Sequence, residues 1–190
     1  MVMVAVAAMS HAALVADTDS SSNVMTVKVM PAKDLKKVPV SVSLANSMPI
    51  TCVQCFVALP DTVDMFCYMY EADKGDTQKP AKERKRKGVA YDRTERWAAT
   101  HQALLSWNTK SCPGTMMALI ASPLNESFAG SDGALLTIYF DASQLGEGEH
   151  SIKMMKANVS WTNGKEIKTF YSPDMEARFL VKDGTVKPVE

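Results

Sequence analysis

The segment 38–63 limits the possible folds of this chain more than any other. From Val38 to Leu44, apolar residues alternate with proline or serine. This period of two places every apolar side chain on one face of a strand. A polar turn follows, and a second apolar run continues over 50–59. Strands with one packed face and one solvated face are typical of an antiparallel sandwich, so the segment predicts two neighbouring strands of such a fold.

Similar short runs recur along the rest of the chain. Turn signals separate nearly all of them, and Asn163-Gly164 is a strong hairpin signal. We predict an all-β fold, an antiparallel β-sandwich of the jelly-roll or immunoglobulin-like type with about nine strands. Residues 92–104 are the one candidate for a short helix and could equally be a loop. The predicted strands cover 24–30, 37–44, 50–59, 63–69, 103–108, 115–121, 134–141, 150–157, 158–162, 166–171 and 177–182.

The length and charge of the chain limit its organisation and its partners. With 190 residues, it is long enough for one domain, which we place at 24–184, followed by a tail at 185–190. The formal net charge is zero, which argues against a protein that binds nucleic acid with its whole surface.

The first 23 residues indicate export. Residues 1–16 are apolar over about the length of a signal-peptide core, and the polar spacer 17–23 follows. The run is too short to span a bilayer, so we expect a signal peptide at 1–16 and a secreted or cell-surface protein. No lysine or arginine precedes Lys28, which departs from the usual basic start of a signal peptide. The alternative is an ordinary apolar strand or helix.

Four cysteines bear on the chemistry of the chain. Cys52 and Cys55 lie three residues apart on one predicted strand, so their side chains point to opposite faces. That placement disfavours a redox or zinc motif. We expect Cys55 in the core, with Cys52 and Phe56 facing outward. A disulfide between Cys67 and Cys112 remains open.

Residues 71–88 contain no large apolar side chain and carry a dense basic run. Because such a segment cannot bury itself, we expect an exposed loop. The loop is either a solvated insertion or a binding surface for polyanions. No aromatic residue interleaves with the charges, which favours the insertion. The basic residues concerned are Lys82, Arg84, Lys85, Arg86 and Lys87.

No catalytic or cofactor-binding motif is present in the sequence. The chain lacks a Gly-x-Ser-x-Gly nucleophile motif, and His101 and His150 show no metal-ligand spacing, so we expect both at the surface. We therefore predict a protein that is not an enzyme and needs no metal or cofactor.

Aromatic residues offer a second kind of binding site. Trp97, Trp107 and Trp161, together with Tyr171, could form a platform that stacks on sugar rings. The alternative is that each tryptophan packs in or beside the core.

One block of the sequence combines Leu44-Ala45-Asn46 with Ile50, Gln54, Leu59 and Pro60. With two later blocks it resembles the cohesin-like sandwich modules of secreted Bacteroidetes-type bacterial proteins, over roughly residues 24–182. Three blocks carry the resemblance. The first departs from the usual pattern at Val53, Cys55 and Phe56, and the basic segment 71–88 is an insertion or an unusually decorated loop. Large aromatic residues are usual at the positions of Val53 and Cys55, and a polar residue is usual at that of Phe56. The matching residues are Leu44-Ala45-Asn46 with Ile50, Gln54, Leu59 and Pro60; Ser122, Asn125, Phe128, Gly130, Gly133, Ala134 and Leu135; and Gly148, Asn158 and Asn163-Gly164-Lys165.

The resemblance implies a non-catalytic extracellular binding module that acts in polysaccharide-handling assemblies. Cohesins grip a dockerin through one sheet face, so a dockerin-like protein is the expected partner. Outward Phe56 and Cys52 are the expected contact residues, because exposed apolar side chains on a sheet face often mark an interface. The alternatives are a carbohydrate-binding module that uses the exposed aromatic residues and a polyanion-binding surface protein that uses the basic loop.

Overall fold

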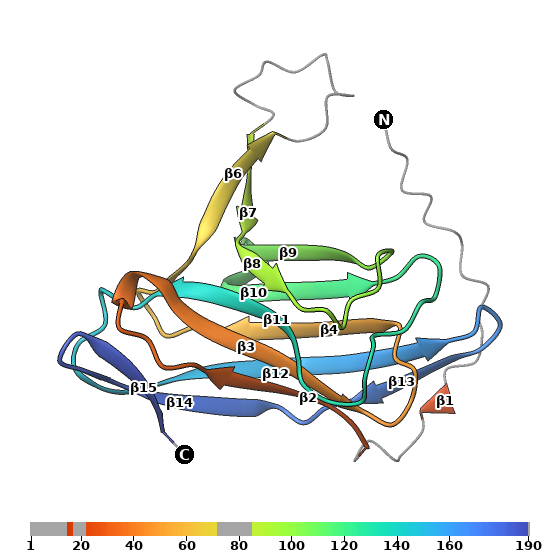
Figure 1. The fold of residues 1–190 in the computed structure, drawn as a ribbon. Helices are drawn as coiled ribbons and strands as arrows, with labels where there is room; N and C mark the ends of the chain where they lie inside the picture. The colour runs from red at the N-terminus through yellow and green to blue at the C-terminus, as the bar shows by residue number, and fades with distance from the viewer. Residues whose placement is uncertain (1–14, 17–21, 72–84, 190) are drawn as a thin grey trace.

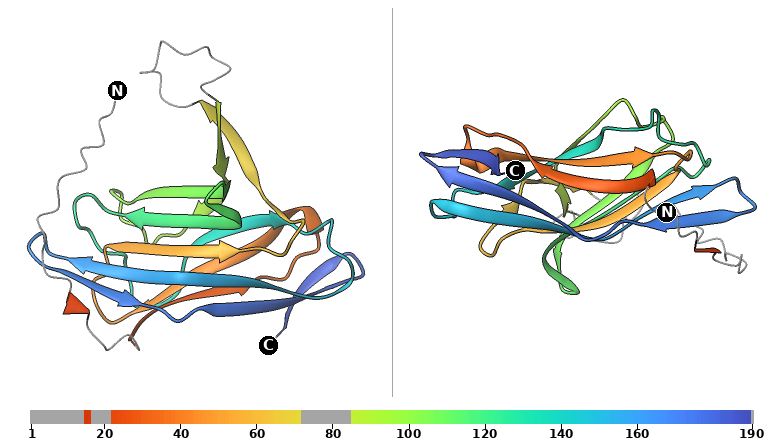
Figure 2. Two further views of the ribbon diagram at one scale, coloured as in Figure 1. Left: turned by 180° about the vertical axis from the view of Figure 1, so that it is seen from behind. Right: turned by 90° about the horizontal axis from the view of Figure 1, so that it is seen from below.

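A computed structural model describes residues 15–16, 22–71 and 85–189 of the chain. Two antiparallel sheets pack face to face (Figure 1), and the right-hand view of Figure 2 shows the layers from below. The described residues contain no α-helix, and Leu35–Lys37 form the 3₁₀ turn η2. The predicted antiparallel β-sandwich is therefore confirmed, although the described residues form fifteen strands, β1 to β15, rather than about nine. Within the described ranges, no helix has the length and apolar character needed to cross a membrane.

The larger sheet has eight strands. Its central strand β12 pairs with β4 on one side, and β10 and β9 continue the sheet beyond β4. On its other side, β12 pairs with β14 near its start and with β13 near its end. The members are β1 (Val15–Ala16), β4 (Cys52–Ala58), β9 (Gln102–Thr109), β10 (Cys112–Ala121), β12 (Gly148–Thr162), β13 (Ile167–Tyr171), β14 (Met175–Lys182) and β15 (Thr185–Val189).

The smaller sheet has five strands in the order β2-β3-β11-β5, and β8 also pairs with β11. A separate hairpin of β6 and β7 stands away from the sandwich (Figure 1). The strands are β2 (Asn23–Val29), β3 (Val38–Asn46), β5 (Asp64–Met65), β6 (Cys67–Glu71), β7 (Lys85–Val89), β8 (Tyr91–Arg93) and β11 (Ala134–Asp141).

The core fills the space between the two sheets, and the sequence alternation builds it. Every second residue of β3, from Val38 to Leu44, is fully buried. The facing sheet contributes buried side chains from β4, β10, β12 and β14. Phe140 of β11 meets Phe179 of β14 edge to face, with ring centroids 5.6 Å apart. This contact joins the two sheets directly.

Several segments differ from the sequence-based expectation. The predicted loop 71–88 begins and ends in strands, because Glu71 belongs to β6 and residues 85–88 belong to β7, which pairs with β6. The expected tail contains strand β15, which pairs with β14. Residues 148–162 form one strand rather than two. The candidate helix at 92–104 is the end of β8, a turn region and the start of β9.

A bulge explains why the long strand β12 keeps its apolar residues in the core. Its register with β4 shifts between Met155 and Asn158. Within the bulge, Lys156 has a positive φ of 50°, and its backbone N–H donates to Asp174 Oδ1 at 3.0 Å. One extra residue on one strand is the usual content of a bulge. As a result, Met154, Ala157 and Val159 are all buried although their spacing breaks the period of two.

Arg96 holds together one end of the sandwich. Its side chain is buried, and its guanidinium donates to the carbonyl oxygens of Leu44 and Gly133 at 2.6 and 2.7 Å. It also donates to Asn46 Oδ1 at 2.7 Å. Further bonds reach the carbonyl oxygens of residues 129 and 130. Burial lowers the pKa of Arg96, and the negative charge of Asp132 opposes that shift. The single side chain thus ties the end of β3 to the loop before β11.

Candidate protein-binding face

The outer face of the eight-stranded sheet carries a cluster of partly exposed apolar side chains. The strand pairings place Phe56 of β4 between Met117 of β10 and Met155 of β12. One step along the strands, Leu119 of β10 lies opposite Leu104 of β9. Leu104 is 57% exposed, and the other four side chains are half-buried. We call these five residues the outer patch.

A shallow cavity adjoins the outer patch at the edge of the sheet. It has a volume of about 400 Å³, and its lining includes Leu104, Leu119, Ala121 and Pro123. The neighbouring side chain of Leu124 is 70% exposed. This corner therefore offers an apolar depression into which a side chain of a partner could insert.

Polar and aromatic residues surround the outer patch. Gln54 of β4 pairs with Asn158 of β12, and Asn158 pairs in turn with Tyr171 of β13. Tyr171 is 55% exposed. An apolar centre with a polar rim is the usual arrangement of protein interfaces.

The bulge in β12 brings a cation to the centre of this face. Lys156 Nζ lies 5.9 Å from the centroid of the Phe56 ring, within the range of a cation–π contact. The aromatic residue that the sequence places outward on β4 is therefore flanked by a positive charge.

The two cysteines of β4 point to opposite faces, as their spacing predicts. Cys55 is buried, whereas Cys52 is half-buried on the outer face. Burial raises the pKa of the Cys55 thiol to about 12 and also raises that of Cys52. Because the thiolate is the reactive form, neither cysteine is poised for redox chemistry. The described residues contain no cluster of metal-ligating side chains.

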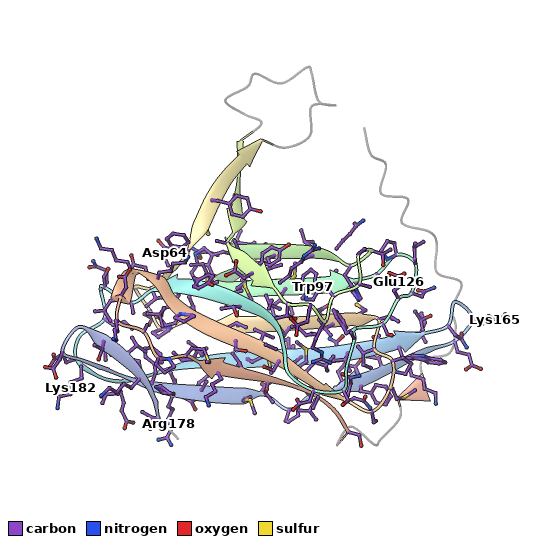
Figure 3. The ribbon with its side chains drawn as sticks, in the orientation of Figure 1. Asp64, Trp97, Glu126, Lys165, Arg178 and Lys182 are labelled. Atoms are coloured by element: carbon purple, nitrogen blue, oxygen red, sulfur yellow. The ribbon has the colours of Figure 1, made fainter. Side chains whose placement is uncertain are left out.

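The structure does not bring the three tryptophans together on one surface. All three are partly buried and pack against the core. Trp97 Nε1 donates to the carbonyl oxygen of Leu135 at 2.7 Å, and Trp107 Nε1 donates to Asp64 Oδ1 at 2.9 Å. Figure 3 labels Trp97 and Asp64. Trp161 lies on β12 beside buried Val159, on the core side of the sheet. Of the aromatic residues that the sequence proposed for a sugar platform, only Tyr171 is exposed.

The basic run lies partly outside the described residues. Lys82 and Arg84 fall outside them, and Lys85, Arg86 and Lys87 belong to β7. Binding of polyanions through these residues stays a prediction.

His101 is buried rather than at the surface, because it packs inside the turn region that precedes β9. Its ring stacks on Phe128 with centroids 4.1 Å apart. Nδ1 accepts a hydrogen bond from the backbone N–H of Ala98 at 2.9 Å, and Nε2 is buried without a partner among the described residues. Burial lowers the pKa of His101, against the opposing charge of Glu126. The other predicted surface histidine, His150, is half-buried.

We expect the stability of the protein to fall as the pH drops below the ordinary histidine pKa of about 6.5. The folded state holds His101 with a lowered pKa, so the unfolded state binds the proton more readily, and acid favours unfolding. Protonation of Nδ1 would also break the bond from Ala98. Urea unfolding between pH 8 and pH 5 measures this effect.

The replacement His101→Gln should reduce this dependence on pH, whereas His150→Gln should retain it. Equal slopes in the wild type and in His101→Gln would show that another group titrates.

The sequence signals found part of the outer patch. Phe56 was identified because it faces outward where a polar residue is usual. Leu104, Met117, Leu119 and Met155 lie on predicted strands, but they were not assigned to the site. These four residues could be assigned to the patch only from their positions opposite or beside Phe56. Those positions are known only once it is known which strands pair.

Comparison with known proteins supports the fold assignment. No protein-family model matches the sequence, and no curated protein matches it. Among solved structures, the chain is similar to the sixth cohesin of scaffoldin B from Acetivibrio cellulolyticus, determined in complex with a mutant Cel5 dockerin. The TM-score is 0.52 at 10% sequence identity, over 82% of this chain and 96% of that chain.

Two further structures are more distant. A non-cellulosomal cohesin from the archaeon Archaeoglobus fulgidus has a TM-score of 0.38 at 12% identity, over 78% of this chain and 91% of that one. The CaDoc0917–CaCohA2 complex matches with a TM-score of 0.43 at 14% identity, over 78% of this chain and 100% of the matched chain. At these identities the likeness concerns the fold, which is a cohesin-like β-sandwich.

Proposed function

We propose that this protein is a non-catalytic binding module that holds a protein partner through the outer patch. The observation that carries the proposal is the open sheet face on which Phe56, Met117, Met155, Leu119 and Leu104 form one apolar cluster. Contiguous apolar surface with a polar rim marks interaction sites on soluble proteins. The solved cohesin of similar fold was determined with a dockerin bound, which supports a dockerin-like partner here.

The position of Phe56 makes it the expected centre of the contact. Large aromatic side chains near the middle of an interface contribute most of its binding energy. The shallow cavity beside Leu104 and Leu119 would receive a side chain of the partner. Lys156, next to the Phe56 ring, favours a partner with an acidic residue at this point.

The test is the replacement Phe56→Asp. We expect it to weaken binding by about a hundredfold, because it places a charge in the centre of an apolar contact. The partner is captured with the immobilised wild-type chain, purified, and titrated against each variant by calorimetry. Leu104→Asp, on the neighbouring strand, should also weaken binding.

The matched control is Ser41→Asp, which places the same charge on the outer face of the other sheet. Ser41 lies opposite Lys28, so the new carboxylate has a cation beside it. Equal affinity of the wild type and Phe56→Asp would contradict the proposed face. Equal loss in Phe56→Asp and Ser41→Asp would assign the effect to charge alone.

We further propose that the module acts outside the cell, in an assembly that handles polysaccharide. The apolar run 1–16 and the polar spacer 17–23 support export, and the similar cohesin belongs to a scaffoldin. N-terminal sequencing of the protein recovered from the medium should find a start beyond the apolar run. An intracellular protein that retains residue 1 would contradict export.

A further inference from the structure

Strand β2 has a free edge on the side away from β3. Among the residues that the structure describes, β2 pairs with β3 alone. In an antiparallel pair, the backbone groups of successive residues point alternately toward the partner strand and away from it. The N–H of Met30 donates to the carbonyl of Pro39, whereas the N–H of Met25 donates away from β3 to Ser172 Oγ. By this alternation, the N–H and C=O groups of Val27 and Val29 point to the free edge.

A groove runs along this free edge. Its volume is about 590 Å³, and β2, β14 and β15 line it. Met175 and Ala177 lie on the side of β14 that faces the core, and both are partly exposed. Figure 3 labels Arg178, which follows on β14 and also lines the groove. The groove therefore combines a row of backbone donors and acceptors with an apolar floor.

The free edge is closed at both ends. At one end, the bond from Met25 to Ser172 Oγ measures 2.9 Å. At the other end, Ala32 and Val186 exchange two backbone hydrogen bonds of 3.0 and 2.8 Å. Residues 26–31 lie between these closures and span about 20 Å at about 3.3 Å per residue. A single extended segment of about six residues fits this length.

We propose that this groove binds an extended peptide segment, which adds to the edge of β2 as a further strand. Unpaired strand edges are the usual site of such additions, because the backbone ladder supplies affinity and alternate side chains supply specificity. The groove dictates the pattern of the segment. Side chains directed at Met175 and Ala177 must be apolar, and the alternate side chains face solvent.

The charges at the rim refine this pattern. Lys28 is exposed on the outer side of β2, where a side chain of the added strand would lie beside it. On the β14 side the lining includes one cation, Arg178, and one carboxylate, Glu176, so the groove has an excess of one positive charge. Opposite charges on neighbouring strands stabilise their pairing. The preferred segment therefore alternates apolar with acidic residues. A second folded copy of this protein does not fit, because the edge of its sheet cannot enter a groove that is closed at both ends.

Hydrogen exchange tests the free edge before any ligand is added. We expect the amides of Val27 and Val29 to exchange about tenfold or more faster than those of Thr26 and Lys28, which bond to β3. Equal protection of all four amides would show that the edge is already paired and would overturn the proposal.

The probe is an acetylated and amidated peptide of sequence Glu-Val-Glu-Val-Glu-Val. We expect it to slow exchange at Val27 and Val29 about tenfold or more at saturation. The same peptide with N-methylated valines should not do so, because it cannot donate to the edge. Equal protection by both peptides, or none by either, would overturn strand addition. Sedimentation measured in parallel would overturn it if the protection follows self-association of the protein.

Two variants locate the binding site. Ala177→Lys fills the floor of the groove and should abolish the protection, whereas Ala99→Lys, on an exposed loop, should leave it unchanged. Val27→Pro removes one edge-facing N–H and leaves the ladder to β3 intact, which edge strands tolerate. Val27→Pro should therefore also weaken binding of the peptide, and it provides the test if Ala177→Lys fails to fold. Full protection in a folded variant of either kind would place the peptide elsewhere, and neither variant alters the outer patch.

Discussion

Replacing Arg96 with alanine is expected to lower the free energy of unfolding by about 3–5 kcal/mol. The replacement removes a donor from five buried or half-buried oxygen acceptors. Of these, the carbonyl of Gly133 keeps the bond from the N–H of Leu44, and the carbonyl of Gly130 keeps a long bond from Asn46 Nδ2. Each unsatisfied buried polar group costs about 1–3 kcal/mol, and water that enters the space recovers part of this cost. Urea unfolding at pH 7 measures the loss.

Two variants test whether the loss of stability comes from the hydrogen bonds of the Arg96 guanidinium rather than from the loss of its volume or its charge. Arg96→Lys keeps a positive charge but cannot reach five acceptors in the same plane, so we expect a loss intermediate between wild type and alanine. Arg93→Ala, on exposed β8, should change stability by less than about 0.5 kcal/mol. Equal stability of Arg96→Ala and Arg93→Ala would show that the network does not hold the loop.

The second large effect is expected at the contact between the two sheets. Phe140 and Phe179 are both fully buried, and their rings meet edge to face. Phe140→Ala removes a large side chain from a close-packed core and should cost about 3–5 kcal/mol. The milder Phe140→Leu should cost less, because it retains most of the apolar volume. Thermal and urea unfolding of the variants measure both costs.

A double-mutant cycle isolates the contact itself. We expect Phe140→Ala and Phe179→Ala together to cost less than the sum of the single losses, with a coupling of about 0.5–1.5 kcal/mol. Strictly additive losses would mean that the two rings contribute independently.

The sequence predicts the individual strands and their buried faces better than it predicts which strands pair. The alternation from Val38 to Leu44 correctly assigns the buried face of β3, because a period of two is a local property of a strand. The same reasoning correctly separates Cys55 from Cys52. The short strand β8 is missed because it is stabilised by pairing with the distant strand β11 rather than by its own pattern. The final strand β15 is also missed, although it pairs with the preceding strand β14 across the turn Asp183-Gly184.

The residues whose burial or role could not be predicted from the sequence are those that contact backbone groups or distant strands. Arg96 lies in a polar stretch and looks exposed, because its acceptors are mainly carbonyl oxygens, which have no sequence signature. His101 was placed at the surface for the same reason, since its stacking partner Phe128 is far along the chain. The outer patch depends on the order β9-β10-β4-β12, which no single strand encodes.

The bulge at Lys156 also limits how this chain can change during evolution. Because of the extra residue, the alternation of inward-facing and outward-facing side chains along β12 shifts by one position at Lys156. Deletion of Lys156 itself would restore the regular period of two and keep Ala157 and Val159 facing the core. Deletion of a residue from the regular part of the strand after the bulge would instead turn the residues that follow it to the opposite face. Replacement of Lys156 keeps the count and leaves the core facing inward. Point substitutions at this position can therefore vary the charge beside Phe56 while the bulge stays in place, whereas deletion of Lys156 would remove both the bulge and that charge.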